Sequence, residues 1–393
     1  MSRNSFHVSA VSWIVIAIVA VFICTMDFGK DSHGSGDRDY LQYWTAEQLL
    51  VHGGNPYDPV ATLKTEKAAG LYRPTPLITL SPPIAFFFAC PLGWVSASTG
   101  LVLWMAVSFA CILISVWLLW ILQGRPNSYY HLAGLIFPPT LWCFLAGQIG
   151  IFILLNAVLF LYWHKSRPFW AGAALVLCSL KPHLFIPCLL VLILWSVRKR
   201  TIRILAGFCA ALAVSCLLTL CLDRQIWMQY AHLGREVRVM EIFLPTISVG
   251  LRFMLNRNAL WIEFVPEAIA CIWAAWYFWS RRDGWDWMDQ GLLVLAVAVA
   301  AAPYSFYPDQ TVLVPAIVAG LRQSEKSPRA LLFFIVMMGA GLISLVTITR
   351  LASLFYIWTA AGWLAWYLYA RQCGRSMGQI TNVTPPEAAS QAI

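Results

Sequence analysis

The chain has 393 residues, of which 60% are hydrophobic and only 11% are charged. This composition excludes a soluble globular domain, in which about 25% of residues carry a charge, and it indicates a polytopic membrane protein. The net charge of +9 does not predict a nucleic-acid partner, because the basic residues form short clusters between apolar segments, as in loops that orient a membrane protein. The 11 Cys include no Cys-x-x-Cys pair, so we expect neither a thiolate metal site nor a disulfide framework.

The apolar segments predict twelve crossings if every short Lys/Arg cluster faces the cytoplasm. We expect residues 11–26 to be an uncleaved first helix, since no small-x-small cleavage site follows them. Proline interrupts two long apolar stretches, at Lys181-Pro182 and from Pro303 to Pro308, which predicts discontinuous helices that line a cavity. The expected crossings are residues 11–26, 98–122, 129–146, 149–164, 168–180, 182–197, 201–222, 259–280, 287–303, 309–321, 329–349 and 351–370.

This count places both termini in the cytoplasm and most polar segments on the outer face of the plasma membrane. Residues 30–76 and 222–258 then form long outer loops. Residues 77–95 contain three prolines and are expected to form a re-entrant or lipid-facing half helix rather than a crossing. We expect residues 1–371 to form a single all-α domain and residues 372–393 to be a disordered cytoplasmic tail.

Residues 36–59 form a polar, patterned segment within the first outer loop. Asp37 and Asp39 precede a helical pattern whose apolar residues share one face, which predicts an amphipathic helix lying on the membrane surface. Gly53 and Gly54 should end this helix, and a tight turn follows. The apolar face would carry Tyr43, Trp44, Leu50 and Val51, and the polar face Gln42, Thr45, Gln48 and His52.

Ionisable groups in apolar surroundings mark candidate sites, because an unpaired buried charge costs several kcal/mol. An ammonium at the helix break of Lys181 suits a phosphate or phosphodiester, and a side chain that reaches the membrane interface is the alternative. Asp309 either caps a helix or faces the cavity, and the Gln148 amide either belongs to a turn or binds a sugar hydroxyl. Arg252 is either a phosphate ligand or a solvated loop arginine, and Glu263 is expected to stabilise a helix start.

The two carboxylates of the first outer loop have three interpretations. They are solvated, or they pair with Lys30 and Arg38, or the Asp37-Arg38-Asp39 alternation holds Mg²⁺ or Mn²⁺. Three residues of this kind arise easily by chance, so we predict no metal and no other cofactor.

Several short motifs between Asp37 and Pro315 form an ordered set. They are Asp39-Tyr40-x-x-Tyr43 with Ala46, Gly53-Gly54-Asn55-Pro56-Tyr57-Asp58, Ser81-Pro82-Pro83 with Pro91-Leu92, Gly147-Gln148, Lys181-Pro182, Ser248 with Arg252, and Ala302-Pro303-Tyr304-Ser305 before Asp309-Gln310. Each motif is short, but their order and spacing resemble the family 87 glycosyltransferases of the GT-C class. Members are polytopic enzymes that use a polyprenyl-phosphate sugar, typically mannose, on the outer face of the membrane.

The resemblance implies a GT-C-like helical bundle and a role for each matched residue. Asp39 corresponds to the first-loop carboxylate assigned as general base, and Lys181 lies where the donor phosphate is held. His183 stands where an amide-bearing residue is expected, and Asp37 adds a second carboxylate, so the identity of the base stays open. We expect His183 and Arg252 to join Lys181 at the donor phosphate, and Asp37, Gln148, Tyr304 and Asp309 to bind the sugar or the acceptor.

The expected activity is inverting transfer of a sugar from the lipid-phosphate donor to a glycolipid or glycan acceptor. A lipid or glycan transporter or flippase is the main alternative, because broken helices and a buried lysine also serve alternating access. A carrier should show matching halves, yet residues 36–59 have no second copy. An assembly subunit is a third alternative, against which the gathering of polar motifs on one face argues.

Overall fold

The computed structural model describes residues 39–70, 74–236, 243–325, 327–346 and 353–381. Every regular element within these residues is a helix, which confirms the all-α prediction. The helix expected at residues 11–26 lies outside the described residues. The α-helices are α2 (Tyr40–Val51), α3 (Pro59–Ala68), α4 (Ile84–Ala89), α5 (Ala97–Leu122), α6 (Ala133–Ile136), α7 (Pro138–Ala146), α8 (Gly150–Trp163), α9 (Pro168–Ala174), α10 (Ile186–Arg198), α11 (Ile202–Leu222), α12 (Ile226–Glu236), α13 (Ile247–Leu255), α14 (Val265–Arg281), α15 (Leu292–Ala301), α16 (Val314–Ser324), α17 (Pro328–Val346) and α18 (Trp358–Thr381).

Short helical turns connect these helices at several points. They are η1 (Cys90–Trp94), η2 (Tyr130–Leu132), η3 (Leu175–Leu180), η4 (Pro182–Leu184), η6 (Leu260–Phe264), η7 (Arg282–Gly284), η8 (Trp287–Gly291), η9 (Tyr307–Leu313) and η10 (Ser353–Tyr356).

Three helices in the described part of the chain are long and apolar enough to cross a membrane. They are α5, α11 and the part of α17 from Pro328 to Leu345, and they match three of the expected crossings. Several other apolar helices are shorter, including α8 and α10. The remaining crossings of the twelve-span topology stay predictions.

The two predicted breaks are confirmed. Lys181 has a non-helical backbone (φ −132°, ψ 65°) between η3 and η4. In the second stretch, α15 ends at Ala301 and η9 begins at Tyr307. A third break, which we did not predict, divides residues 129–146 at Phe137, because Pro138 and Pro139 lack the N–H groups that would continue α6 into α7.

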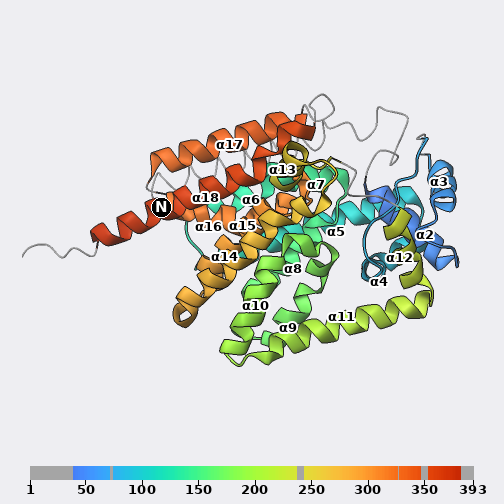
Figure 1. Ribbon diagram of the computed structural model, residues 1–393, viewed down its shortest axis with the longest axis horizontal. Coiled ribbons are helices and arrows are strands. Elements are labelled where there is room, and N and C mark those ends of the chain that lie inside the picture. Colours follow the sequence, from blue (N-terminus) through green and yellow to red (C-terminus); the bar gives the residue numbers. More distant parts are fainter. Residues whose placement is uncertain (1–38, 71–73, 237–242, 326, 347–352, 382–393) are drawn as a thin grey trace, which may run out of the picture.

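Helix α2 forms where the pattern predicts it, but it does not lie on the surface. The helix ends in a left-handed Gly53 (φ 75°), and Gly53 and Gly54 donate to the carbonyls of Leu50 and Leu49 in a Schellman arrangement. Eight of its residues are buried, including Thr45 and Glu47. The reason is that α3, α4, η1 and α5 pack around it, at the end of the molecule shown at the right of Figure 1. The prediction of a surface-lying amphipathic helix is therefore wrong.

Residues 84–94 form two short helices, α4 and η1, that pack against each other and against α2. Their combined length is roughly 19 Å, about two-thirds of the ~30 Å hydrocarbon thickness of a bilayer. This length fits the half helix that we expect, and its re-entrant or lipid-facing placement stays a prediction.

The closest helix packing joins α9 to α11. A side chain at Gly172 would meet the Ile204 carbonyl oxygen at 1.8 Å, and one at Gly207 would meet the Phe169 carbonyl oxygen at 1.9 Å. Only glycine permits this approach, which places α9, and η3 after it, against the long helix α11.

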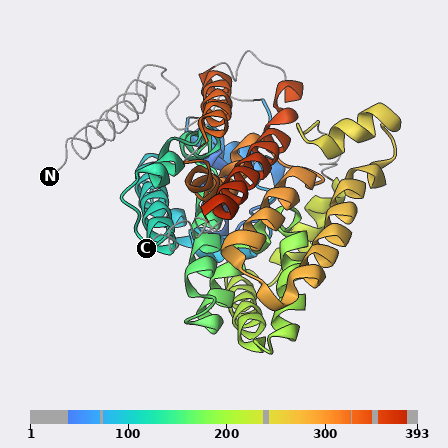
Figure 2. The same cartoon turned by 90° about the vertical axis from the view of Figure 1, so that its left-hand side faces the viewer.

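The C-terminal helix α18 packs against α15, α16 and α17. Figure 2 shows it across the middle of the view, with the cyan α5 on one side and the yellow and orange α13 and α14 on the other. It continues to Thr381, beyond the domain boundary that we expect at Arg371. Residues 382–393 of the expected tail lie outside the described residues.

Candidate active site

A cavity of about 930 Å³ lies where the broken helices meet. Its wall includes residues from α2, the connector between α7 and α8, both helix breaks and η6. The polar lining comprises Gln42, Tyr43, Ser81, Gln148, Ser179, Lys181, His183, Tyr230, Glu263, Tyr304, Ser305 and Asp309. Five of the residues singled out from sequence therefore share one cavity wall: Gln148, Lys181, His183, Tyr304 and Asp309.

Asp39, at the start of α2, joins this wall through Gln148. The Gln148 Nε2 donates a hydrogen bond of 2.6 Å to Asp39 Oδ2, and the Tyr43 hydroxyl donates one of 3.2 Å to Gln148 Oε1. Tyr43 lies one helical turn after Asp39. The i, i+4 spacing could therefore have identified Tyr43 as a neighbour of Asp39 in the site, whereas we assigned it to an apolar helix face.

The connector approaches α2 closely because residue 147 is glycine. Gly147 has a left-handed backbone (φ 68°), and a side chain there would come within 2.6 Å of the Tyr40 Cβ. The Trp104 Nε1 of α5 donates a 3.0 Å hydrogen bond to the Gly147 carbonyl and its ring stacks on Tyr43 at 5.4 Å. These contacts place Gln148 beside Asp39.

Lys181 and Asp309 form an ion pair that joins the two helix breaks. Both side chains are largely buried. Asp309 also accepts a 2.9 Å hydrogen bond from the Phe306 N–H, so it both caps η9 and faces the cavity. Burial lowers the pKa of the Lys181 ammonium, but the charge and hydrogen bond of Asp309 and weaker contributions from other groups together raise it by more, so the net shift is upward and favours the charged lysine. Asp39 acts on Lys181 in the same direction.

His183 and Tyr304 contact each other across the two breaks, with their ring centroids 4.1 Å apart. Helix α13 anchors the segment before Tyr304, because Thr246 donates to the Pro303 carbonyl at 3.3 Å and Ser248 donates to the Ala301 carbonyl at 3.2 Å. The aromatic pair therefore has a fixed place on the wall.

Arg252 is buried, so its interpretation as a solvated loop arginine is wrong. Its Nε lies 2.5 Å from Glu263 Oε1, and its Nη1 donates to the Arg257 carbonyl at 2.8 Å. Glu263, rather than Arg252, lines the cavity. From sequence we expected Glu263 only to stabilise a helix start. Its ion-pair partner Arg252 lies in α13, whereas Glu263 lies in η6, so the spacing within one helix could not indicate the pair. Asp37 lies outside the described residues.

Apolar helices that enclose a cavity lined by carboxylates, a lysine, an amide and aromatic hydroxyls define a helical membrane protein with a site for a polar substrate. A family model described as glycosyltransferase family 87 matches residues 80–321, more than half of the chain. The chain therefore belongs to glycosyltransferase family 87 and is a glycosyltransferase. This assignment sets aside the carrier and assembly-subunit alternatives. No curated protein and no solved structure matches the chain.

The buried ion pair predicts that single replacements at Lys181 and Asp309 are not independent. Lys181→Met should destabilise the protein by about 3–5 kcal/mol, because it leaves the Asp309 carboxylate buried without its counterion. The double variant Lys181→Met/Asp309→Asn should recover most of the loss, since Asn still accepts from the Phe306 N–H. Thermal unfolding in detergent, followed by tryptophan fluorescence, measures both. Equal stability of the single variant and the wild type would contradict the coupling.

Proposed function

We propose that the protein transfers a sugar, mannose, from a polyprenyl-phosphate donor to a hydroxyl group of a lipid or glycan acceptor, with inversion. The observation that carries this proposal is that one cavity wall holds the Lys181 ammonium and Gln148, whose amide donates to the Asp39 carboxylate. Asp39 precedes the residues that match the family model, but its bond to Gln148 ties it to a residue within them.

The proposed reaction needs a base, a cation for the phosphate and a water-poor cavity. Asp39 takes the proton of the acceptor hydroxyl, whose oxygen attacks the anomeric carbon from the side opposite the phosphate. The bond from the anomeric carbon to the phosphate oxygen breaks, and its electron pair leaves with the polyprenyl phosphate. Lys181 stabilises that anion: its ammonium has three donors, so it can bind phosphate while one donor contacts Asp309.

His183, Tyr304 and Asp309 line the same wall and are proposed to contact the donor phosphate or the sugar. Arg252 was expected at the phosphate, but it pairs with Glu263, so we assign its guanidinium no direct contact with the donor. Sugar hydroxyls are the ligands that such carboxylate, amide and phenol groups bind.

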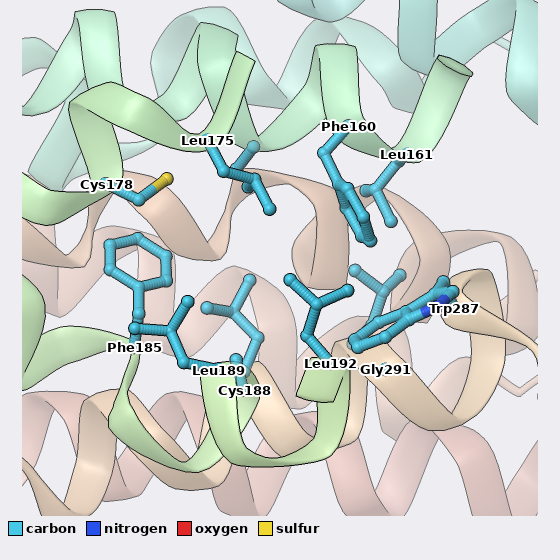
Figure 3. Close-up of a pocket in the computed structure, with 13 residues that line it drawn as sticks. Phe160, Leu161, Leu175, Cys178, Phe185, Cys188, Leu189, Leu192, Trp287 and Gly291 are labelled. Carbon is cyan, nitrogen blue, oxygen red and sulfur yellow. The ribbon is translucent and has the colours of Figure 1, made fainter. Parts of the chain in front are cut away.

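An apolar pocket of about 60 Å³ supports a lipid-linked donor. Cys178 and Phe185, which lie three residues before and four residues after Lys181, line one end of it, and Phe160 and Trp287 line the other (Figure 3). In this view, leucine side chains from η3 and α10 face each other across the pocket. Hydrocarbon suits such a lining better than any polar group does. We propose that prenyl carbons next to the phosphate bind here.

Asp39→Asn should lower the transfer rate by about 10²- to 10⁴-fold, because the amide keeps the shape of the carboxylate but cannot accept a proton. The measurement is transfer of radiolabelled mannose from polyprenyl-phosphate mannose, with total membrane lipid as the source of acceptor. Asp37→Asn is the matched comparison and should lose far less activity than Asp39→Asn.

Full activity of Asp39→Asn would remove the base assignment. Equal losses in both variants, together with inhibition by a chelator, would instead favour a Mg²⁺ or Mn²⁺ site at the two carboxylates. Wild-type protein that transfers sugar from no lipid-phosphate donor would overturn the proposed donor class.

The phosphate role of Lys181 predicts a change in donor affinity. The charge-neutral variant Lys181→Met/Asp309→Asn should raise the donor KM roughly 10- to 100-fold, the loss expected for a hydrogen bond to a charged group. The readout is donor KM at constant acceptor, alongside the unfolding temperature. An unchanged KM in a stable double variant would show that the ammonium does not bind the phosphate.

The proposed topology puts the cavity on the outer face of the plasma membrane and both termini in the cytoplasm. Arg235 and Arg200 are both exposed, in an expected outer loop and an expected inner loop. In a background in which the exposed Cys209 and Cys221 are replaced by Ser, Arg235→Cys should react with an impermeant maleimide in intact cells. Arg200→Cys should react only after permeabilisation, and labelling of it from outside would reverse the assignment.

A further inference from the structure

The NH₂ group and the oxygen of the Gln148 amide each form a hydrogen bond with another side chain of the protein. Its NH₂ group donates to Asp39 Oδ2 at 2.6 Å and its oxygen accepts from the Tyr43 hydroxyl at 3.2 Å. A flipped amide would set its oxygen against the carboxylate, so only one orientation satisfies both partners.

The backbone that carries Gln148 is held as firmly as its side chain. Gly147 packs against Tyr40, and the Trp104 indole N–H donates to the Gly147 carbonyl. The Gln148 N–H in turn donates to the Cys143 carbonyl at 2.9 Å. The donor to Asp39 therefore comes from a rigid connector that lies 109 residues further along the chain.

We propose that Gln148 is a positioning residue for the base rather than a ligand of the sugar. By holding Oδ2, it sets the plane of the Asp39 carboxylate and so the direction from which the acceptor hydroxyl can be deprotonated. The assignment rests on the proposed role of Asp39. It differs from the role expected from sequence, in which the amide binds a sugar hydroxyl, because the amide oxygen and one N–H of the amide already bind protein groups.

Gln148→Met, which keeps the length of the side chain without its hydrogen bonds, should lower the maximal transfer rate on the order of 10- to 100-fold and leave the donor KM nearly unchanged. Gln148→Glu should also be impaired: it still accepts from Tyr43 and could still accept from a sugar hydroxyl, but it sets a second carboxylate against Asp39 in place of the amide donor. Polyprenyl-phosphate mannose is the donor, and gel filtration shows that each variant is folded.

Asp39→Glu provides the coupling test, because it keeps a carboxylate but moves it by one methylene group. Gln148→Met should cost much less in this background than in the wild type, since the carboxylate has already left the place that Gln148 defines. Additive losses, a change in donor KM alone, or full activity of both Gln148 variants would overturn the positioning role. These outcomes are distinct from a failure of the base assignment, in which Asp39→Asn itself retains activity.

Discussion

The ion pair between Lys181 and Asp309 is the constraint on which the site depends. A lysine and an aspartate taken out of water are tolerated only when they are paired and hydrogen-bonded. Each stands at a point where an apolar helix is interrupted, so pairing the charges also brings the two interruptions together. Backbone that leaves the helical path at this depth needs a protein or aqueous surface to face. The cavity is that surface.

A second set of contacts fixes the distance between the two halves of the site. Helix α7 packs against η9, and the buried hydroxyls of Thr140 and Thr311 are 2.7 Å apart. The same helix α7 leads into Gly147 and Gln148, while η9 carries Asp309. The proposed base Asp39 and the proposed phosphate ligand Lys181 thus belong to one packed unit, although α2 and η3 do not follow one another in the chain. A reaction that needs an attacking oxygen and a leaving phosphate on opposite sides of one carbon benefits from this rigidity.

Local chemistry made the breaks and the helix end predictable. Proline removes a backbone donor whatever surrounds it, and Gly53 adopts a left-handed conformation that other residues avoid. The placement of α2 was not predictable in this way. Its aromatic residues were taken to face lipid, whereas Tyr40 and Trp44 donate hydrogen bonds to carbonyls near the start of α5. A periodic pattern shows which residues avoid water. It does not show whether their apolar face packs against protein or against lipid.

Pairings between residues far apart in the chain could not be predicted from the sequence, for a different reason. Lys181 and Asp309 were each identified as candidates, but nothing in the order of residues indicates that they meet across 128 positions. Arg252 and Glu263 form an ion pair between two helices. From sequence alone, a solvated loop arginine and a carboxylate at a helix start were sufficient explanations for them. The residues of the site were therefore largely predictable, while their partners, and the positioning role that we propose for Gln148, required coordinates.

The separation of Lys181 from Asp309 also bears on how the chain enters the membrane during translation. The helical segments on either side of Lys181 are shorter than the ~20 residues of a typical membrane span, and the lysine is synthesised well before its counterion. Until the segment with Asp309 arrives, an unpaired ammonium opposes deep burial of this hairpin. In the expected topology, deep burial of residues 168–198 would therefore wait until the ribosome has passed residue 309, 128 positions after Lys181.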